Sequence, residues 1–246
     1  MMIIAKFQLY GLSHITALAL TVLGAICMVK FMRSEVAEEM KKKVRYLFGG
    51  LLIFAVSMDP VLTFLRWGTD ELGWEIFWNS ALPLYLCDVV SIVAALALIT
   101  KNFKLAEVAY LWGLAGTVQG LLTPTLAYDW DTLDYYNFFL QHSGVPIAAV
   151  TLVWGMGIVP RKGAFKRIVL WSWVYMATVI GINFLIKQNY GFLSAKPEFD
   201  TMFDYMGPYP YYLMTLQVIA FTFYYILLKL APRNEPTEKG SRINGT

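Results

Sequence analysis

Charged residues are scarce in this sequence. Only 15% of its 246 residues are Asp, Glu, Lys or Arg, and 58% are hydrophobic. Because a typical soluble domain carries about 25% charged residues, the composition excludes an ordinary soluble domain and favours an integral membrane protein. No long polar linker divides the chain, which predicts one membrane domain over residues 1–233. The polar stretch 234–246 is expected to be a short disordered cytoplasmic tail.

Cysteine and histidine are rarer still, with two residues of each. Two cysteines exclude a disulfide framework, and Cys27 and Cys87 are expected at different membrane depths. His14 and His142 lack the short ligand spacing of a typical zinc site, so we expect no metal and no cofactor. The basic residues fall in short runs beside apolar segments. They therefore report membrane topology and indicate no nucleic-acid partner.

Seven apolar segments are each long enough to cross a bilayer, which takes about 20 helical residues. They cover residues 7–32, 44–67, 81–100, 105–122, 138–159, 168–187 and 209–230. This pattern predicts an all-α, polytopic membrane protein with seven transmembrane helices.

The cationic residues are distributed unevenly between the connections. Sixteen of the 20 Lys and Arg residues lie on one side: 13 are in the first, third and fifth connections or beyond the last segment, and Lys30, Arg45 and Lys229 are at the adjoining segment ends. Cytoplasmic loops carry such an excess, so the N-terminus is predicted outside and the C-terminus inside. The localisation expected from this pattern is the plasma membrane, which the chain crosses several times.

Polar side chains inside the apolar segments share one depth. Each lies in the outer half of its segment, about 8–12 Å deep for those counted from an outer end at 1.5 Å per residue. They are His14, Asp59, Cys87, Asp88, Gln119, His142, Asn183 and Gln217. Such a layer predicts a common polar cavity that opens toward the outer leaflet.

A structural interpretation competes at every position of this layer. A single polar group in a span often makes only a helix-to-helix hydrogen bond, and Asp59 precedes Pro60, which can kink a helix. Carboxylic acids inside a span are costly and are usually functional. A thiol and an imidazole together suit nucleophilic acyl transfer, in which the base takes the thiol proton and a third group orients the base. Cys87 and His142 are therefore the catalytic candidates.

Three motifs carry a resemblance to a known family. They are Leu82-Pro83-Leu84-Tyr85-Leu86-Cys87-Asp88, Gln141-His142-Ser143-Gly144, and Asn189-Tyr190-Gly191-Phe192-Leu193 followed by Lys196-Pro197. With them the chain resembles the bacterial YwaF family of integral membrane proteins. That family is similar to the animal transmembrane protein 164, an intramembrane acyltransferase that builds polyunsaturated ether phospholipids. The resemblance implies a catalytic cysteine at Cys87 and a catalytic histidine at His142.

Two functional hypotheses follow. The first is an intramembrane acyltransferase or lipid thioesterase that forms a Cys87 acyl-enzyme, with a phospholipid or lysophospholipid from the membrane as substrate. The alternative is a transporter, or a membrane protein that binds a small ligand or lipid, using the same cavity. The segment around Asn189 and Tyr190 is expected either to cap the site or to be a plain turn that ends a helix at Gly191.

Overall fold

The computed structural model describes residues 5–197 and 202–232. Apart from an isolated bridge between Lys6 and Tyr128, all regular structure in these ranges is helical, which confirms the predicted all-α class. The elements are α1 (Leu12–Arg33), α2 (Glu38–Trp67), α3 (Glu71–Ile76), η1 (Phe77–Ala81), α4 (Leu86–Thr100), α5 (Phe103–Trp112), η2 (Gly113–Thr117), α6 (Val118–Leu122), α7 (Leu133–Val150), η3 (Thr151–Gly155), α8 (Ala164–Ile186), η4 (Tyr190–Phe192), η5 (Met202–Met206) and α9 (Tyr211–Leu230). The predicted tail, 234–246, lies outside the described residues.

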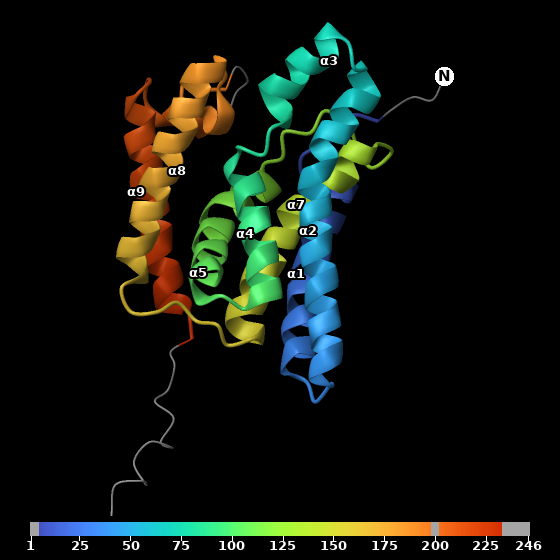
Figure 1. Ribbon diagram of the computed structural model, residues 1–246, viewed down its shortest axis with the longest axis vertical. Coiled ribbons are helices and arrows are strands. Elements are labelled where there is room, and N and C mark those ends of the chain that lie inside the picture. Colours follow the sequence, from blue (N-terminus) through green and yellow to red (C-terminus); the bar gives the residue numbers. More distant parts are fainter. Residues whose placement is uncertain (1–4, 198–201, 233–246) are drawn as a thin grey trace, which may run out of the picture.

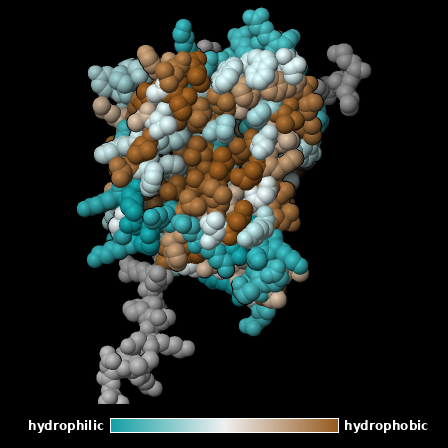
Figure 2. Space-filling model, in the orientation of Figure 1, coloured by the Kyte–Doolittle hydropathy of each residue, from teal (hydrophilic) through white to brown (hydrophobic). Residues whose placement is uncertain are grey.

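The outer surface of the helices is apolar. Phe184, Leu185 and Leu65 are 83%, 78% and 74% exposed. Figure 2 shows hydrophobic side chains across the middle of one face and hydrophilic ones toward both ends. Among the described residues, six helices are long and apolar enough to cross a membrane, and the number is seven when the bent pair 71–81 and 86–100 is counted as one span. Exposed apolar area on this scale is typical of contact with lipid, so the chain is a multi-pass membrane protein.

Helices α4, α5 and α7 form the centre of the bundle (Figure 1). The pair α1 and α2 packs on one side of this centre, and the pair α8 and α9 lies on the other. Small residues allow the close approach: Ala94, Ala109 and Ala148 are fully buried on three different helices. Van der Waals packing of this kind stabilises helix pairs in lipid, where burial from water supplies no driving force. Helix α7, which carries His142, contacts both α1, which carries His14, and α4, which carries Cys87.

The two ends of the bundle differ in charge. The connections 34–37, 101–102 and 156–163 lie at one end, here called the cationic end, and α3 and the connection 123–132 lie at the other, the acidic end. Asp70, Asp129 and Asp131 are at the acidic end. This separation agrees with the predicted grouping of the connections, and the assignment of the cationic end to the cytoplasm stays a prediction. Residues 233, 239 and 242, three of the counted cations, lie outside the described residues.

The third span differs from the prediction. Residues 81–100 were expected to form one helix, but η1 ends at Ala81, α4 begins at Leu86, and the two arms are bent by 70°. Pro83 is the physical reason, because a residue before proline is driven out of the α region. Leu82 accordingly has φ −74° and ψ 140°. Cys87 is therefore in the first turn of a helix rather than two turns inside one.

Candidate functional site

The N-terminus of α4 carries the candidate nucleophile. Cys87 is the second residue of the helix and Asp88 is the third, directly after the turn 82–85. Broken helices at membrane depth are tolerated where they are buried in protein or line a cavity. Gly116 on η2 lies against this end of α4, so that an added Cβ would come within 2.7 Å of Leu86 Cδ2. The break therefore presents a helix terminus to the interior of the bundle.

Asp88 is the direct partner of the thiol. Its Oδ1 lies 3.9 Å from the Sγ of Cys87 and accepts a hydrogen bond of 2.6 Å from the side-chain amide of Gln141. Its Oδ2 accepts a bond of 3.2 Å from the backbone N–H of Tyr85, which also caps the helix. Asp88 is only 4% exposed. The carboxylate is thus fixed by three donors and placed to receive the thiol proton.

Two backbone donors beside the thiol are free. Apart from the Cys87 sulfur itself, the N–H groups of Leu86 and Cys87 have no protein acceptor among the described residues. The first N–H groups of a helix have no partner within the helix, and together they stabilise negative charge at its N-terminus. In acyl transfer, donors in this position would face the oxyanion that forms on the attacked carbonyl.

A second acid belongs to a cavity at the acidic end. Asp59 on α2 accepts a hydrogen bond of 2.8 Å from Asn137 on α7. A cavity of about 200 Å³ reaches this carboxyl, and Arg66 and Asp134 form an ion pair in its wall. It is lined by Asp59, Leu62, Thr63, Arg66, Trp67, Ile76, Ser80, Ala81 and Asp134. Asn137 and Gln141 are one turn apart on α7, so one face of this helix binds both Asp59 and Asp88.

His142 follows Gln141 on the same helix. Its Nδ1 lies 3.0 Å from the carbonyl oxygen of Phe138, which can only accept, so Nδ1 carries the proton and Nε2 keeps a free lone pair. The ring stacks on Phe138 with centroids 3.9 Å apart and packs against Gly120 of α6. No hydrogen bond joins His142 to Cys87 among the bonds of the described residues. The predicted thiol–imidazole pair is therefore not hydrogen-bonded in this structure.

Other residues of the predicted layer have bonds elsewhere. His14 uses both ring nitrogens on backbone groups, with Nε2 2.9 Å from the carbonyl of Leu121 and Nδ1 3.0 Å from the N–H of Tyr10. Gln217 accepts from the indole of Trp173 at 2.7 Å and so joins α9 to α8. These contacts make His14 and Gln217 packing residues.

Gln119 lies on α6, half-buried. Its side chain makes no hydrogen bond to the described part of the protein. It therefore belongs to neither of the amide–carboxylate pairs that hold Asp59 and Asp88.

Tyr190 and its neighbours hold the turn before α4. The phenol of Tyr190 donates to the carbonyl of Trp78 at 2.9 Å and accepts from the N–H of Leu82 at 3.1 Å. Burial raises the pKa of the Tyr190 phenol above its ordinary value, so the hydroxyl keeps its proton for this bond. The Asn183 amide binds the backbone N–H and carbonyl of Tyr190 at 2.8 and 2.9 Å. Tyr190 therefore acts on Cys87 through the position of the turn.

Asn189 organises the loop that follows. Its Oδ1 accepts from the N–H groups of Ser194 and Ala195, both at 3.0 Å, and its amide donates to the carbonyl of Ala195. Gly191 has φ 66°, a left-handed conformation that suits glycine. Helix α8 itself ends earlier, at Ile186, with Lys187 in the left-handed conformation as its C-cap, so the expected helix end at Gly191 was wrong and Gly191 is part of the following short helix η4.

Sequence reasoning missed three polar groups. Gln141 was noticed only within a motif, and Asn137 fell just outside the predicted fifth segment, although α7 begins at Leu133. Their spacing of four residues on one helix face was a usable signal. Thr117 on η2 was also missed; it is 3% exposed, and its Oγ1 has no partner in the described part of the chain. It lies on the same helix face as Gly113 and Gly120, which contact α7.

Metal ligands are not assembled in the described ranges. No group of three or more His, Cys, Asp and Glu side chains there has a geometry that could hold a metal ion. Cys27 is exposed on α1, and both cysteines are free thiols.

These features define a multi-pass helical membrane protein with a polar site at the N-terminus of a broken helix. A model of the TMEM164 family matches residues 9–228, so the chain belongs to the TMEM164 family. No curated protein and no solved structure matches it. The predicted similarity to transmembrane protein 164 is confirmed at the level of the family.

Proposed function

We propose that this protein is an intramembrane acyltransferase, or a lipid thioesterase, that uses Cys87 as its nucleophile. The observation that supports this most directly is the thiol at the first turn of α4, beside the fixed carboxylate of Asp88 and two free N–H groups. A nucleophile, a proton acceptor and oxyanion donors are the parts that acyl transfer requires. The substrates are membrane phospholipids or lysophospholipids, since the site belongs to a candidate membrane span.

The first half of the reaction forms a thioester. The sulfur of Cys87 attacks the ester carbonyl carbon of a phospholipid while the thiol proton passes to the Asp88 carboxylate. The N–H groups of Leu86 and Cys87 bind the oxyanion. Collapse of this adduct breaks the acyl C–O bond, and the leaving lysophospholipid oxygen takes the proton from Asp88.

The second half consumes the thioester. The hydroxyl of an acceptor lysophospholipid attacks the acyl carbon, and its proton passes through a base to the departing sulfur. His142 is proposed to take the proton from the acceptor hydroxyl, because its Nε2 keeps a free lone pair, and Asp88, the direct partner of the thiol, to pass it on to the sulfur. The family resemblance likewise assigns a catalytic role to His142. In a thioesterase, water replaces the acceptor hydroxyl and a fatty acid is released.

Cys87→Ser tests the nucleophile. The substitution keeps the shape of the side chain but replaces the thiol by a far weaker acid, so transfer from an alkyne-labelled phospholipid should fall by about 10³-fold or more. A hydroxylamine-sensitive acyl adduct should form on the parent and not on the variant. Cys27→Ser is the matched control and should behave as the parent, because Cys27 lies on another helix and is exposed.

The double variant Cys87→Ser/His142→Ala tests whether the two residues act together. Residues of one catalytic unit are strongly non-additive, so the double variant should be little worse than Cys87→Ser alone. Normal lipid processing by Cys87→Ser would overturn covalent catalysis.

The cavity at Asp59 favours one second candidate. A pocket of about 200 Å³ with an acid, an ion pair and a polar lining suits a transporter or a small-ligand binding protein. In that case Asp59→Asn should abolish ligand binding or uptake while Cys87→Ser leaves it intact. The acyltransferase proposal predicts the opposite order of the two defects.

The membrane orientation is proposed on the charge distribution alone. The cationic end faces the cytoplasm and the acidic end faces outward, in the plasma membrane. Cys87, near the acidic end of its helix, would then act on lipids of the outer leaflet.

A further inference from the structure

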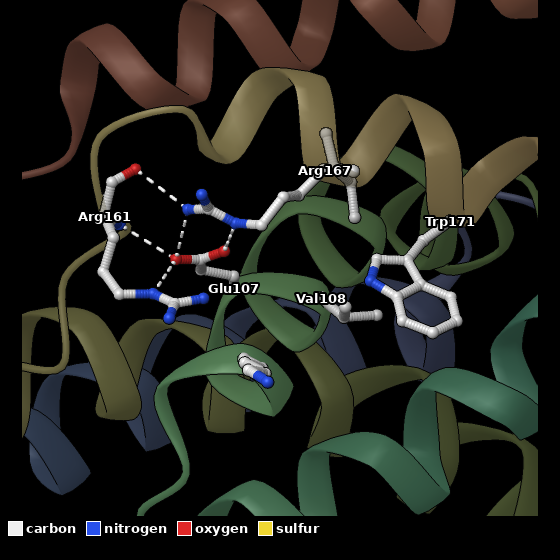
Figure 3. A pocket seen from close by; sticks show the side chains of 7 residues that line it. Glu107, Val108, Arg161, Arg167 and Trp171 are labelled. Carbon is white, nitrogen blue, oxygen red and sulfur yellow. Dashed lines mark hydrogen bonds and ion pairs between the residues drawn. The ribbon is translucent and has the colours of Figure 1, made fainter.

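A second polar site lies at the cationic end, far along the bundle from the Cys87 site. It is a shallow pocket between the start of α5, the connection 156–163 and the start of α8 (Figure 3). It offers about 30 Å³ to a water-sized group, enough for at least one water molecule or one phosphate oxygen. The lining residues are Lys104, Glu107, Val108, Arg161, Arg167, Ile168 and Trp171.

Glu107 is the only acid of the pocket, and its oxygens are already occupied. It is 4% exposed and accepts bonds of 3.0 and 2.6 Å from the backbone N–H and Nε of Arg161. Arg167 adds two bonds of 3.0 Å through Nε and Nη2. Figure 3 shows the carboxylate held between the two guanidinium groups. With Lys104, three cations face one anion, so the pocket keeps an excess of two positive charges.

The remaining donors are exposed and available to an external ligand. The Nη1 and Nη2 groups of Arg161 and the Nζ of Lys104 have no acceptor within the described part of the chain. Arg167 is different, because Nη1 donates to the carbonyl of Lys162 and Nη2 also contacts that of Arg161. The hydrogen bond to Glu107 raises the pKa of Arg161 above its ordinary value, so this side chain is always charged. The Arg161 guanidinium is thus held by Glu107 through Nε, while Nη1 and Nη2 are free. A guanidinium with free donors of this kind can bind a phosphate.

The surroundings are amphipathic. Trp171, 51% exposed, lies one turn further into the apolar belt than Arg167, with Val108 and Ile168 beside it. Tryptophan is enriched where a membrane protein crosses the headgroup region. A ligand with an anionic head and an apolar tail would both pair with the free cations and cover the apolar side chains of Val108, Ile168 and Trp171.

We propose that this pocket binds the phosphate of an anionic phospholipid from the leaflet at the cationic end. Basic pockets between transmembrane helices bind lipid head groups in this way. The bound lipid would join α5 to α8 at the place where the Glu107 network already connects the central helices to the outer pair. The proposal does not depend on Cys87 chemistry.

The test measures lipid retention by the full-length protein. Protein in mixed vesicles of phosphatidylglycerol and phosphatidylcholine is extracted, and its bound lipid is counted by native mass spectrometry. Phosphatidylglycerol should be preferred over phosphatidylcholine. Lys104→Gln should lower this preference by about fivefold, which corresponds to roughly 1 kcal/mol per cation, without disturbing Glu107. Arg161→Lys should also lower the preference for phosphatidylglycerol, because lysine lacks the forked guanidinium that would bind the phosphate. The variant keeps the ion pair with Glu107.

Lys43→Gln is the matched control. Lys43 is an exposed cation at the same end on α2, without an ion pair, and its loss should leave the preference unchanged. Equal retention of both lipids, or an equal effect of Lys43→Gln and Lys104→Gln, would overturn the proposal. An arm with inorganic phosphate separates the sources: displacement of the lipid by millimolar phosphate would show a free-anion site and refute the lipid assignment.

Discussion

Gly120→Ala is the sharpest test of the place of His142 in the reaction. A Cβ at position 120 would lie 2.7 Å from Cδ2 and 3.0 Å from Nε2 of His142, whereas ordinary contact begins at 3.4 Å. The imidazole must therefore move by about 0.7 Å or more. The ring is held by the carbonyl of Phe138 and stacks on that side chain, so the movement disturbs both contacts. A displacement of about 1 Å at a reacting group costs roughly 10²-fold in rate, and we expect a loss of about tenfold to 10²-fold.

The stability of this variant should change much less than its activity. Overpacking costs about 1–3 kcal/mol, and replacing a helical glycine by alanine returns about 1 kcal/mol. Gly50→Ala and Gly181→Ala are the controls, because both positions are helical and, apart from the adjacent backbone of the helix itself, no described atom lies within 4 Å of the added Cβ. The assay is acyl transfer from an alkyne-labelled phospholipid, with thermal unfolding measured in parallel. A folded Gly120→Ala protein that transfers acyl chains as fast as the two controls would remove His142 from the mechanism.

Three further predictions concern the interior and the topology. Thr117→Val should raise the stability to unfolding by about 1 kcal/mol, because it removes a buried hydroxyl without a partner, and thermal unfolding in detergent measures it; a destabilised variant would show that the hydroxyl has a partner. Gln141→Leu should cost about 1–3 kcal/mol, since it deprives Asp88 of its amide donor, whereas Gln119→Leu should stay within about 0.5 kcal/mol. In a background without Cys27, an impermeant thiol reagent added outside should label Thr132→Cys and not Ser34→Cys; the reverse pattern would invert the topology.

The transmembrane helices were predictable because long apolar runs dominate hydropathy. The ends of the helices were less predictable. The fifth span was expected to begin at residue 138, but α7 begins at Leu133. Tyr135 and Tyr136 stand where an interfacial aromatic belt would be expected, but Tyr135 is buried and donates to the carbonyl of Ser13. A tyrosine in the first turn of a span gives the same sequence pattern whether it lies at the membrane interface or is buried in the protein.

The break before α4 was visible in principle and was not predicted. Hydropathy continues from Ala81 to Thr100 without interruption, and only Pro83 indicated that a helix could not continue there. The bend itself is maintained by Tyr190 and by Tyr175, whose hydroxyl donates to the carbonyl of Leu84 at 2.9 Å. Both tyrosines are about 90 residues or more away in sequence, and no local pattern specifies such contacts.

The candidate site was predictable as a set of residues but not as a set of bonds. Depth counting brought Asp59, Cys87, Asp88 and His142 to one layer. The pairing of each acid with an amide of α7 depends on how closely α2 and α4 approach that helix. Such approach is set by packing at small residues such as Gly144, where an added Cβ would come within 2.6 Å of Leu52. Hydropathy carries no information on that distance.

The shortness of α4 affects the bilayer around it. This helix is only one arm of the bent third span, and the other arm is turned away by 70°. The 15 residues of α4 cover about 22 Å at 1.5 Å per residue, some 8 Å less than a hydrocarbon core of about 30 Å. A bilayer responds to such hydrophobic mismatch by thinning locally or by drawing head groups inward. Either response lowers the ester carbonyls, which lie at the edge of the hydrocarbon layer, toward the depth of the Cys87 thiol. Membrane thickness thereby becomes a property on which access to this site depends, and thin bilayers should favour it.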